Sequence, residues 1–266
     1  MLKICSIASG SSGNCIYIGT DETHLLLDAG ISGKRAEQGL EQLGIELSRL
    51  NGILITHEHL DHVKGLGVLE RKQPVPMYMT DGTVGELKNM PQIGTIPWDM
   101  QHTVRNGEPF TIGDISVKPI TVSHDAAEPV AYRFEADGRS LAVITDLGYY
   151  NEEIVSSLKG LHMILLEANY DFGMLQTGSY PYPLKQRIHG MNGHLSNEDA
   201  GRLVNEIWNC ELHHVLLGHL SKENNMPLLA YETVRSELLL SDTPEALSTV
   251  KIEVLKREEM SSLIQV

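Results

Sequence analysis

The sequence is poor in cysteine, and its cysteines do not pair in the chain. The 266 residues include three cysteines, Cys5, Cys15 and Cys210, and none of them forms the CxxC spacing of a zinc finger or a dithiol motif. We therefore expect reduced, structural cysteines of the kind found inside cells. A thiolate metal ligand is the alternative reading.

Long apolar runs are also missing. No stretch is long enough to cross a bilayer. The start Met1-Leu2-Lys3-Ile4 lacks the charged region, apolar core and cleavage site of a signal peptide. These two absences predict a cytoplasmic protein with no membrane partner. Low-complexity tracts and long linkers are absent as well, so the sequence predicts a single domain over residues 1–266.

Positive charge is scarce. Lysine and arginine number 21 against 35 acidic residues, which gives a formal net charge of −14. This balance excludes broad electrostatic adhesion to duplex DNA or to membranes. It leaves a nucleic-acid substrate open, because bound divalent ions and a local basic patch supply positive charge only where it is needed.

Apolar runs of strand length alternate with helical patterns along the chain, and turns rich in glycine separate them. This alternation predicts an α/β fold. The expected strands are residues 3–8, 15–18, 23–27, 52–56, 75–79, 108–112, 115–122, 130–136, 140–145, 163–166, 214–217 and 252–255, and the expected helices are 34–43, 82–88, 151–159, 197–208 and 227–240.

The strongest chemical signal is the run His57-Glu58-His59-Leu60-Asp61-His62, which directly follows a buried strand. Residues two apart in extended chain point the same way, so His57 and His59 can hold one ion. Asp61 and His62 can then face a neighbouring ion from the next turn. Imidazole and carboxylate ligands suit zinc, and also manganese or iron. A surface turn rich in histidine is the alternative.

Three further residues stand directly after predicted strands. They are His124, Asp146 and His219. Ligands in open α/β sheets gather just beyond the carboxyl ends of strands, so these residues are candidate ligands of the same centre. Each of them alone is more typical of a packed or solvated side chain.

These elements, in this order, resemble the metallo-β-lactamase superfamily along almost the whole chain. The order is Asp28 in Leu25-Leu26-Leu27-Asp28-Ala29-Gly30, the histidine run, His124, Asp146 and His219. The segments Ser9-Gly10-Ser11-Ser12-Gly13-Asn14, Ser123-His124-Asp125-Ala126, Gly193-His194-Leu195-Ser196-Asn197 and His219-Leu220-Ser221-Lys222-Glu223-Asn224-Asn225 are similar to the YycJ (WalJ) group of nuclease-like members.

The resemblance implies an αβ/βα four-layer sandwich of two mixed sheets with outer helices. It also implies two divalent metal ions. It assigns His57, His59 and His124 to one ion, Asp61, His62 and His219 to the other, and Asp146 to both. Asp28 would orient a ligand histidine. Taken by itself, Asp28 is as typical of a cap in the turn before Gly30.

Candidate substrate contacts lie in the second half of the chain. His194 occupies a Gly-His-Leu-Ser segment similar to one in ribonuclease J, whose histidine contacts the scissile phosphate. The resemblance makes His194 a phosphate contact or a general acid. Lys185 and Arg187 add local positive charge, and Asn224 could bond a phosphate or cap a helix. The alternative is that residues 180–187 form a Pro-rich loop whose charged side chains are only solvated.

These observations favour a metal-dependent phosphodiesterase that acts on nucleic acid, DNA rather than RNA, and the resemblance suggests a 5′-to-3′ exonuclease that uses a metal-bridging hydroxide. The expected catalytic residues are Asp61, His194 and Asp28. The fold serves many substrates, so a small-molecule hydrolase, such as a lactonase or thioesterase, is the alternative. A binding or redox module is disfavoured, because every candidate ligand is present.

Overall fold

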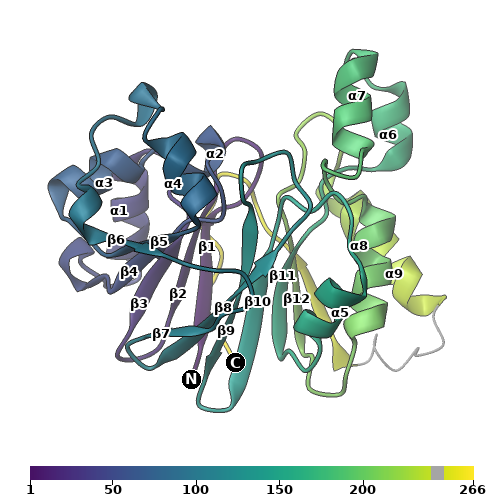
Figure 1. The fold of residues 1–266 in the computed structure, drawn as a ribbon. Helices are drawn as coiled ribbons and strands as arrows, with labels where there is room; N and C mark the ends of the chain where they lie inside the picture. Colours follow the sequence, from purple (N-terminus) through teal and green to yellow (C-terminus); the bar gives the residue numbers. More distant parts are fainter. Residues whose placement is uncertain (241–248) are drawn as a thin grey trace. The chain divides into compact units, whose positions relative to one another are not determined.

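The computed structural model describes residues 1–240 and 249–266, and these fall into two compact units (Figure 1). Unit 1 comprises Met1–Thr121, Ala126–Gly138 and Lys256–Val266, and unit 2 comprises Val122–Asp125 and Arg139–Leu255. The chain passes between the units more than once, so neither is one continuous segment. The single domain expected for residues 1–266 stays a prediction.

Unit 1 contains a seven-stranded mixed sheet in the order β14-β1-β2-β3-β4-β5-β6. Strands β14, β1, β2 and β3 pair antiparallel, whereas β3 to β6 pair in parallel. The bounds are β14 Ile264–Gln265, β1 Lys3–Ala8, β2 Cys15–Gly19, β3 His24–Leu27, β4 Gly52–Leu54, β5 Met77–Met79 and β6 Gln101–Thr103. An antiparallel group follows in the same unit, made of β7 Phe110–Ile112, β8 Ile115–Thr121 and β9 Val130–Ala136.

Helices pack on the sheet of unit 1 and close its main apolar core. They are α1 Gly33–Gln42, α2 Leu60–Val63, α3 Leu66–Lys72 and α4 Asp81–Leu87, with short 3₁₀ turns at Leu47–Arg49, Pro91–Ile93 and Trp98–Met100. The core includes Ile7 of β1 and Leu40 of α1. A side chain at Gly39 would lie 2.5 Å from Ile7, so glycine lets α1 approach the sheet closely.

Unit 2 is built on parallel strands in the order β13-β12-β11-β10. Their bounds are β10 Arg139–Ile144, β11 Met163–Glu167, β12 His214–Gly218 and β13 Lys251–Val254. The run Met163-Ile164-Leu165-Leu166 is fully buried, as expected for a strand covered on both faces. Helices α5 Glu152–Leu158, α8 Asn197–Ile207 and α9 Pro227–Leu239 accompany this sheet, and α6 Phe172–Thr177 and α7 Tyr182–His189 follow β11.

The structure confirms the α/β class and most of the predicted elements to within a few residues. Helices α2, α3, α6 and α7 and strands β6 and β14 were not predicted. The Pro-rich loop reading of residues 180–187 is wrong, because Tyr182–His189 is helical. Pro183 fits there because it stands in the first turn, where a backbone N–H has no helical partner to lose.

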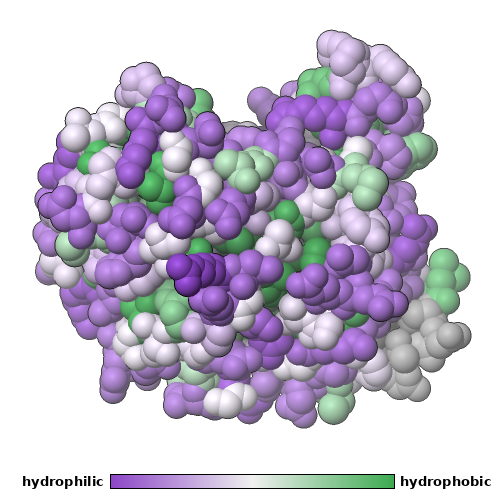
Figure 2. Space-filling model, viewed as in Figure 1, coloured by the Kyte–Doolittle hydropathy of each residue, from purple (hydrophilic) through white to green (hydrophobic). Residues whose placement is uncertain are grey.

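The face of the molecule in Figure 2 is mostly hydrophilic. Within the part of the chain that the structure describes, no helix is both long and apolar enough to cross a membrane.

Candidate metal centre

In unit 1 the ends of β3 and β4 bring together a buried carboxylate and the start of the histidine run. Asp28 accepts hydrogen bonds from the backbone N–H of Thr56 at 2.9 Å and from Nδ1 of His62 at 2.7 Å. The Thr56 hydroxyl lies 3.0 Å from Oδ2 of Asp28 and 3.0 Å from Nδ1 of His57. Both rings therefore have Nδ1 fixed, which leaves Nε2 as the nitrogen that can bind a metal.

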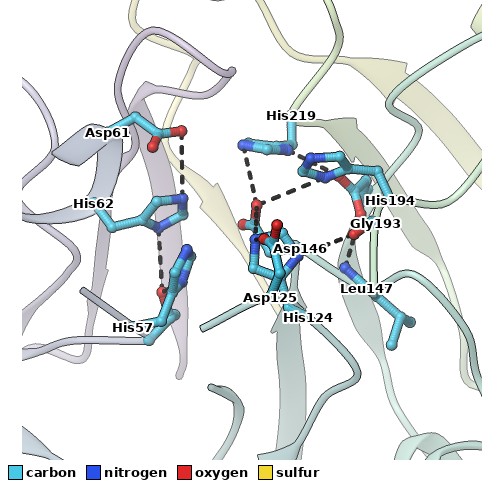
Figure 3. Close-up of polar contacts among 12 residues, drawn as sticks. His57, Asp61, His62, His124, Asp125, Asp146, Leu147, Gly193, His194 and His219 are labelled. Carbon is cyan, nitrogen blue, oxygen red and sulfur yellow. Dashed lines mark hydrogen bonds and ion pairs between the residues drawn. The ribbon is translucent and has the colours of Figure 1, made fainter. Parts of the chain in front are cut away.

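The rest of the run follows within the same unit. His59 is the N-cap residue of α2, and its ring lies 4.6 Å from that of His57 in an edge-on arrangement. Asp61 lies in the first turn of α2, and its carboxylate lies 3.6 Å from Nε2 of His62 (Figure 3). The rings of His59 and His62 lie 4.6 Å and 4.1 Å from that of His57, and the role of the run as metal ligands stays a prediction.

In unit 2 a second group of ligand atoms gathers at the carboxyl ends of β10, β11 and β12. Asp146, Glu167, His194 and His219 each offer one atom, and these atoms lie within 4.8 Å of one another. Oδ1 of Asp146 lies 3.6 Å from Nε2 of His219, 3.6 Å from Nε2 of His124 and 3.7 Å from Nδ1 of His194 (Figure 3).

Glu167 was missed by sequence reasoning. Its carboxylate is fully buried and accepts hydrogen bonds from Nδ1 of His194 at 2.7 Å and from Nδ1 of His219 at 2.8 Å. The backbone N–H of Leu147 donates to its other oxygen at 2.9 Å. Burial by itself raises the pKa of Glu167, but His194 and His219 lower it to about 2. An ionised Glu167 therefore fixes both rings and turns both Nε2 atoms away from itself.

The electrostatics of His124 and His194 differ. Burial lowers the pKa of His124, and its Nδ1 lies 3.0 Å from the carbonyl oxygen of Gly193, so the ring is held neutral with Nε2 as the ligand atom. Burial also acts to lower the pKa of His194, but the charges of Glu167 and Asp146 outweigh it and raise the value. A cationic His194 can attract a phosphate and can donate a proton.

Three of the predicted site residues have backbone conformations that are rare for residues other than glycine. Asp28 has φ of 61°, Asp146 of 57° and His219 of 54°, each just after a strand. Such left-handed residues cost about 1–3 kcal/mol each and gather at functional sites.

Of the predicted substrate contacts, Lys185 and Arg187 are engaged with protein groups, whereas the side-chain amide of Asn224 is buried without a hydrogen-bond partner among the described residues. The Lys185 ammonium donates to the carbonyl oxygen of Gln176 at 2.7 Å and so ties α7 to α6. The Arg187 guanidinium pairs with Asp125, which neighbours His124. Asn224 is 1% exposed, and its backbone carbonyl accepts from the N–H of Asp171. Their role in substrate binding stays a prediction.

The residues present fit divalent metal ions. Nδ1 of each of His62, His124 and His219 faces a carboxylate or a backbone carbonyl, which is the outer support that metal-bound histidines use. The donor set of imidazole and carboxylate suits zinc, manganese or iron. The fold and the two groups of donors define a metal-dependent hydrolase of the metallo-β-lactamase fold.

Comparison with known proteins agrees with this class. Residues 23–218 match the family described as "Beta-lactamase superfamily domain". The chain is 44% identical to "Exodeoxyribonuclease YycJ" of Bacillus anthracis over 237 residues, which cover 89% of each chain. It is 40% identical to "Exodeoxyribonuclease WalJ" of Streptococcus pneumoniae strain D39, over 90% of this chain and 89% of the relative.

Solved structures share the fold at low sequence identity. The crystal structure of Zn²⁺-bound PqqB from Methylobacterium extorquens is 19% identical, with a TM-score of 0.74 over 98% of this chain and 99% of that one. The chain therefore belongs to the beta-lactamase superfamily and, within it, to the family of YycJ and WalJ. The resemblance and the fold class predicted from the sequence are confirmed.

Proposed function

We propose that the chain is a deoxyribonuclease with a two-metal centre, and that it removes nucleotides from the 5′ end of a DNA strand in the cytoplasm. Relatives that are 40–44% identical are named exodeoxyribonucleases, which supports the DNA substrate and the exonuclease mode. The 5′-to-3′ direction rests on the family resemblance.

In this proposal His57, His59 and His124 hold one ion, Asp61, His62 and His219 hold the other, and Asp146 touches both. The fixed Nδ1 atoms of the histidines and the central place of Asp146 among three of them support the assignment. Asp28 orients His62. Bound divalent ions would supply Lewis-acid chemistry for the attack on phosphorus.

The chain's own residues handle the leaving group. His194 lies between the carboxylates of Glu167 and Asp146, and their charges raise its pKa. Nδ1 donates to Glu167, so the proton on Nε2 can be passed to the oxygen that departs from phosphorus. The placement of His194 beside the carboxylates of Glu167 and Asp146 is the observation that carries the proposal, because a phosphodiester needs both an anion contact and a proton donor.

A substrate panel tests the function. Metal-loaded protein is assayed with single- and double-stranded DNA, RNA and a generic lactone. We expect DNA to be cleaved with the highest kcat/KM and mononucleotides to appear first from the 5′ end. Preferred cleavage of the lactone would instead support a small-molecule hydrolase.

His194→Ala tests the role of this histidine. The variant should keep its metal ions and lose activity on DNA by about 10²–10³-fold, the loss typical when one positioned donor is removed. His213→Ala, which alters a histidine outside the site, is the matched control. Metal loss in His194→Ala would make His194 a ligand and would remove it from the role of proton donor.

A further inference from the structure

The loop between β1 and β2, residues 9–14, is fastened to the metal-ligand residues of unit 1. The backbone N–H of Asn14 donates to the carbonyl oxygen of Asp61 at 2.7 Å, and its amide nitrogen lies 3.1 Å from Nε2 of His62. Its amide oxygen accepts from the N–H of Gly10 at 2.9 Å, which closes the loop on itself. The loop therefore keeps one position beside Asp61 and His62.

Glycines make this close approach possible. A side chain at Gly30 would lie 1.6 Å from the carbonyl oxygen of Asp61, and the N–H of Gly30 donates to the carbonyl of Asn14 at 2.7 Å. Gly13 has φ of +156°, and a side chain there would lie 2.8 Å from the Gly30 carbonyl oxygen. The loop, Gly30 and Asp61 thus pack backbone to backbone, without side chains between them.

An arginine from the far end of the sequence lies on this loop. The stem of Arg257 runs along Gly10, where an added Cβ would be 3.2 Å from its Cγ, and Nη2 lies 3.5 Å from the hydroxyl of Ser12. Ser11 and Ser12 are both exposed. The combination places a guanidinium and two hydroxyls on a glycine-rich turn next to ligand residues, in a chain whose net charge is −14.

We propose that loop 9–14 and Arg257 bind a second phosphate group of the nucleic-acid strand, distinct from the phosphate that is cleaved. Guanidinium and hydroxyl groups together are donors that proteins use for phosphate. The phosphate is either the terminal 5′-phosphate or a neighbouring backbone phosphate. The inference rests on the proposed nuclease function and adds to it a contact that positions the strand.

The test compares Arg257→Gln and Ser12→Ala with the wild type. The matched control is Arg105→Gln, which removes an exposed arginine of unit 1 that lies 3.9 Å from the carboxylate of Glu108. The substrates are a single-stranded oligonucleotide with a 5′-phosphate, the same strand with a 5′-hydroxyl, and the small chromogenic diester bis(p-nitrophenyl) phosphate. Metal-loaded protein is used throughout.

Arg257→Gln should raise KM for the phosphorylated strand by roughly tenfold or more, as for a lost hydrogen bond to a charged group. Ser12→Ala should raise it less, and Arg105→Gln should not change it. Because one phosphate contact is lost, the slope of log K against log salt should fall in magnitude by about 0.7. Rates on the small diester should stay unchanged, because that substrate reaches only the metal centre.

The same experiment distinguishes the terminal 5′-phosphate from a backbone phosphate as the group that is bound. A rise in KM confined to the 5′-phosphorylated strand assigns the site to the terminal phosphate, and an equal rise for both strands assigns it to the backbone. If wild type cleaves DNA while Arg257→Gln and Ser12→Ala match it on both strands, the phosphate site is refuted and the nuclease function stands. If wild type neither binds nor cleaves a strand, the proposed function fails first.

Discussion

The carboxylate of Glu167 lies 2.7 Å from Nδ1 of His194 and 2.8 Å from Nδ1 of His219, so one buried side chain orients a proposed proton donor and a proposed metal ligand. The two histidines arrive from segments on either side of α8, and Glu167 is the last residue of β11. The end of β11 thus positions the proposed proton donor and the proposed metal ligand relative to each other.

Replacing Glu167 with glutamine should disturb both functions. Glutamine offers one acceptor where the carboxylate serves two histidines and two backbone N–H groups, so we expect metal affinity and activity to fall by about 10- to 100-fold. Removing the negative charge should also lower the pKa of His194. The cationic ring would then be lost at a lower pH, and the alkaline limb of the activity profile should move to lower pH.

Glu206→Gln is the matched control, because Glu206 accepts from the hydroxyl of Tyr150 at an exposed position of the same unit. Metal titration and pH–rate profiles of the three proteins provide the measurement. An unchanged profile in Glu167→Gln would show that Glu167 does not act through His194.

Asp146→Ala should lose a large part of the bound metal. Its Oδ1 atom lies about equally far from His124, His194 and His219, which is the position expected of a carboxylate shared by two ions. Elemental analysis after gel filtration should give close to two divalent ions per chain for wild type and markedly fewer for the variant. Asp99→Ala, outside the site, serves as control, and equal metal content in all three proteins would remove Asp146 from the ligand set.

Arg187 and Asp125 form an ion pair, and we expect their substitutions to change DNA binding in opposite directions. If Arg187 contacts the strand, Arg187→Ala should weaken binding of single-stranded DNA, whereas Asp125→Asn should strengthen it, because the guanidinium no longer has a competing carboxylate. Losing both Lys185 and Arg187 should reduce the salt slope by roughly 1.4 if both contact phosphates. Fluorescence anisotropy across a salt series measures these effects, with metal content checked for Asp125→Asn because of its neighbour His124.

The same series can contradict the assignment. Weaker binding in Asp125→Asn, or an unchanged slope in Lys185→Ala/Arg187→Ala, would mean that these charges only hold α7 in place. Lys185 donates a hydrogen bond to the carbonyl oxygen of Gln176, which is consistent with such a structural role.

Glu70 makes the stability of the protein depend on pH. This carboxyl is buried in α3, and burial raises its pKa from the ordinary 4.5 to about 7, although the N–H of Val75 donates to it. The folded state therefore holds the proton more tightly than the unfolded chain. Stability from this group is full below pH 4.5 and is lost as the pH rises towards 7.

Glu70→Gln should remove this dependence. The variant should be more stable than wild type by about 1–3 kcal/mol at pH 8 and little different at pH 4. Urea unfolding at the two pH values measures the difference, with Glu86→Gln at an exposed position of the same unit as control. A gain of equal size at both pH values would point to packing instead of ionisation.

Sequence spacing indicated the candidate ligands of unit 1 because they stand within six residues of one another, where the local turn decides which way they face. His124, Asp146 and His219 were also named as candidates, since each follows an apolar run that could be recognised as a strand. The role of Asp28 came only through resemblance, because its partners Thr56 and His62 are distant in sequence and come together through the pairing of β3 with β4.

Glu167 was missed because it stands directly after the predicted strand 163–166 and matches no segment of the resemblance. An acidic residue that ends a fully apolar strand is itself a signal, the same one that marked Asp146. The contacts of Lys185, Arg187 and Arg257 could not be predicted, because each depends on where a long side chain ends and not on a repeating pattern.

The left-handed backbone at Asp28, Asp146 and His219 has a consequence for the life of the protein in a cell. Each of these residues raises the free energy of the folded chain by about 1–3 kcal/mol, against a total stability of typically 5–15 kcal/mol. Bound metal offsets this through mass action, since it binds the folded state. A metal-starved cell should therefore degrade this protein faster than a metal-replete cell, so the abundance of the protein would follow the metal supply. Pulse–chase half-lives with and without a chelator would show whether degradation depends on metal.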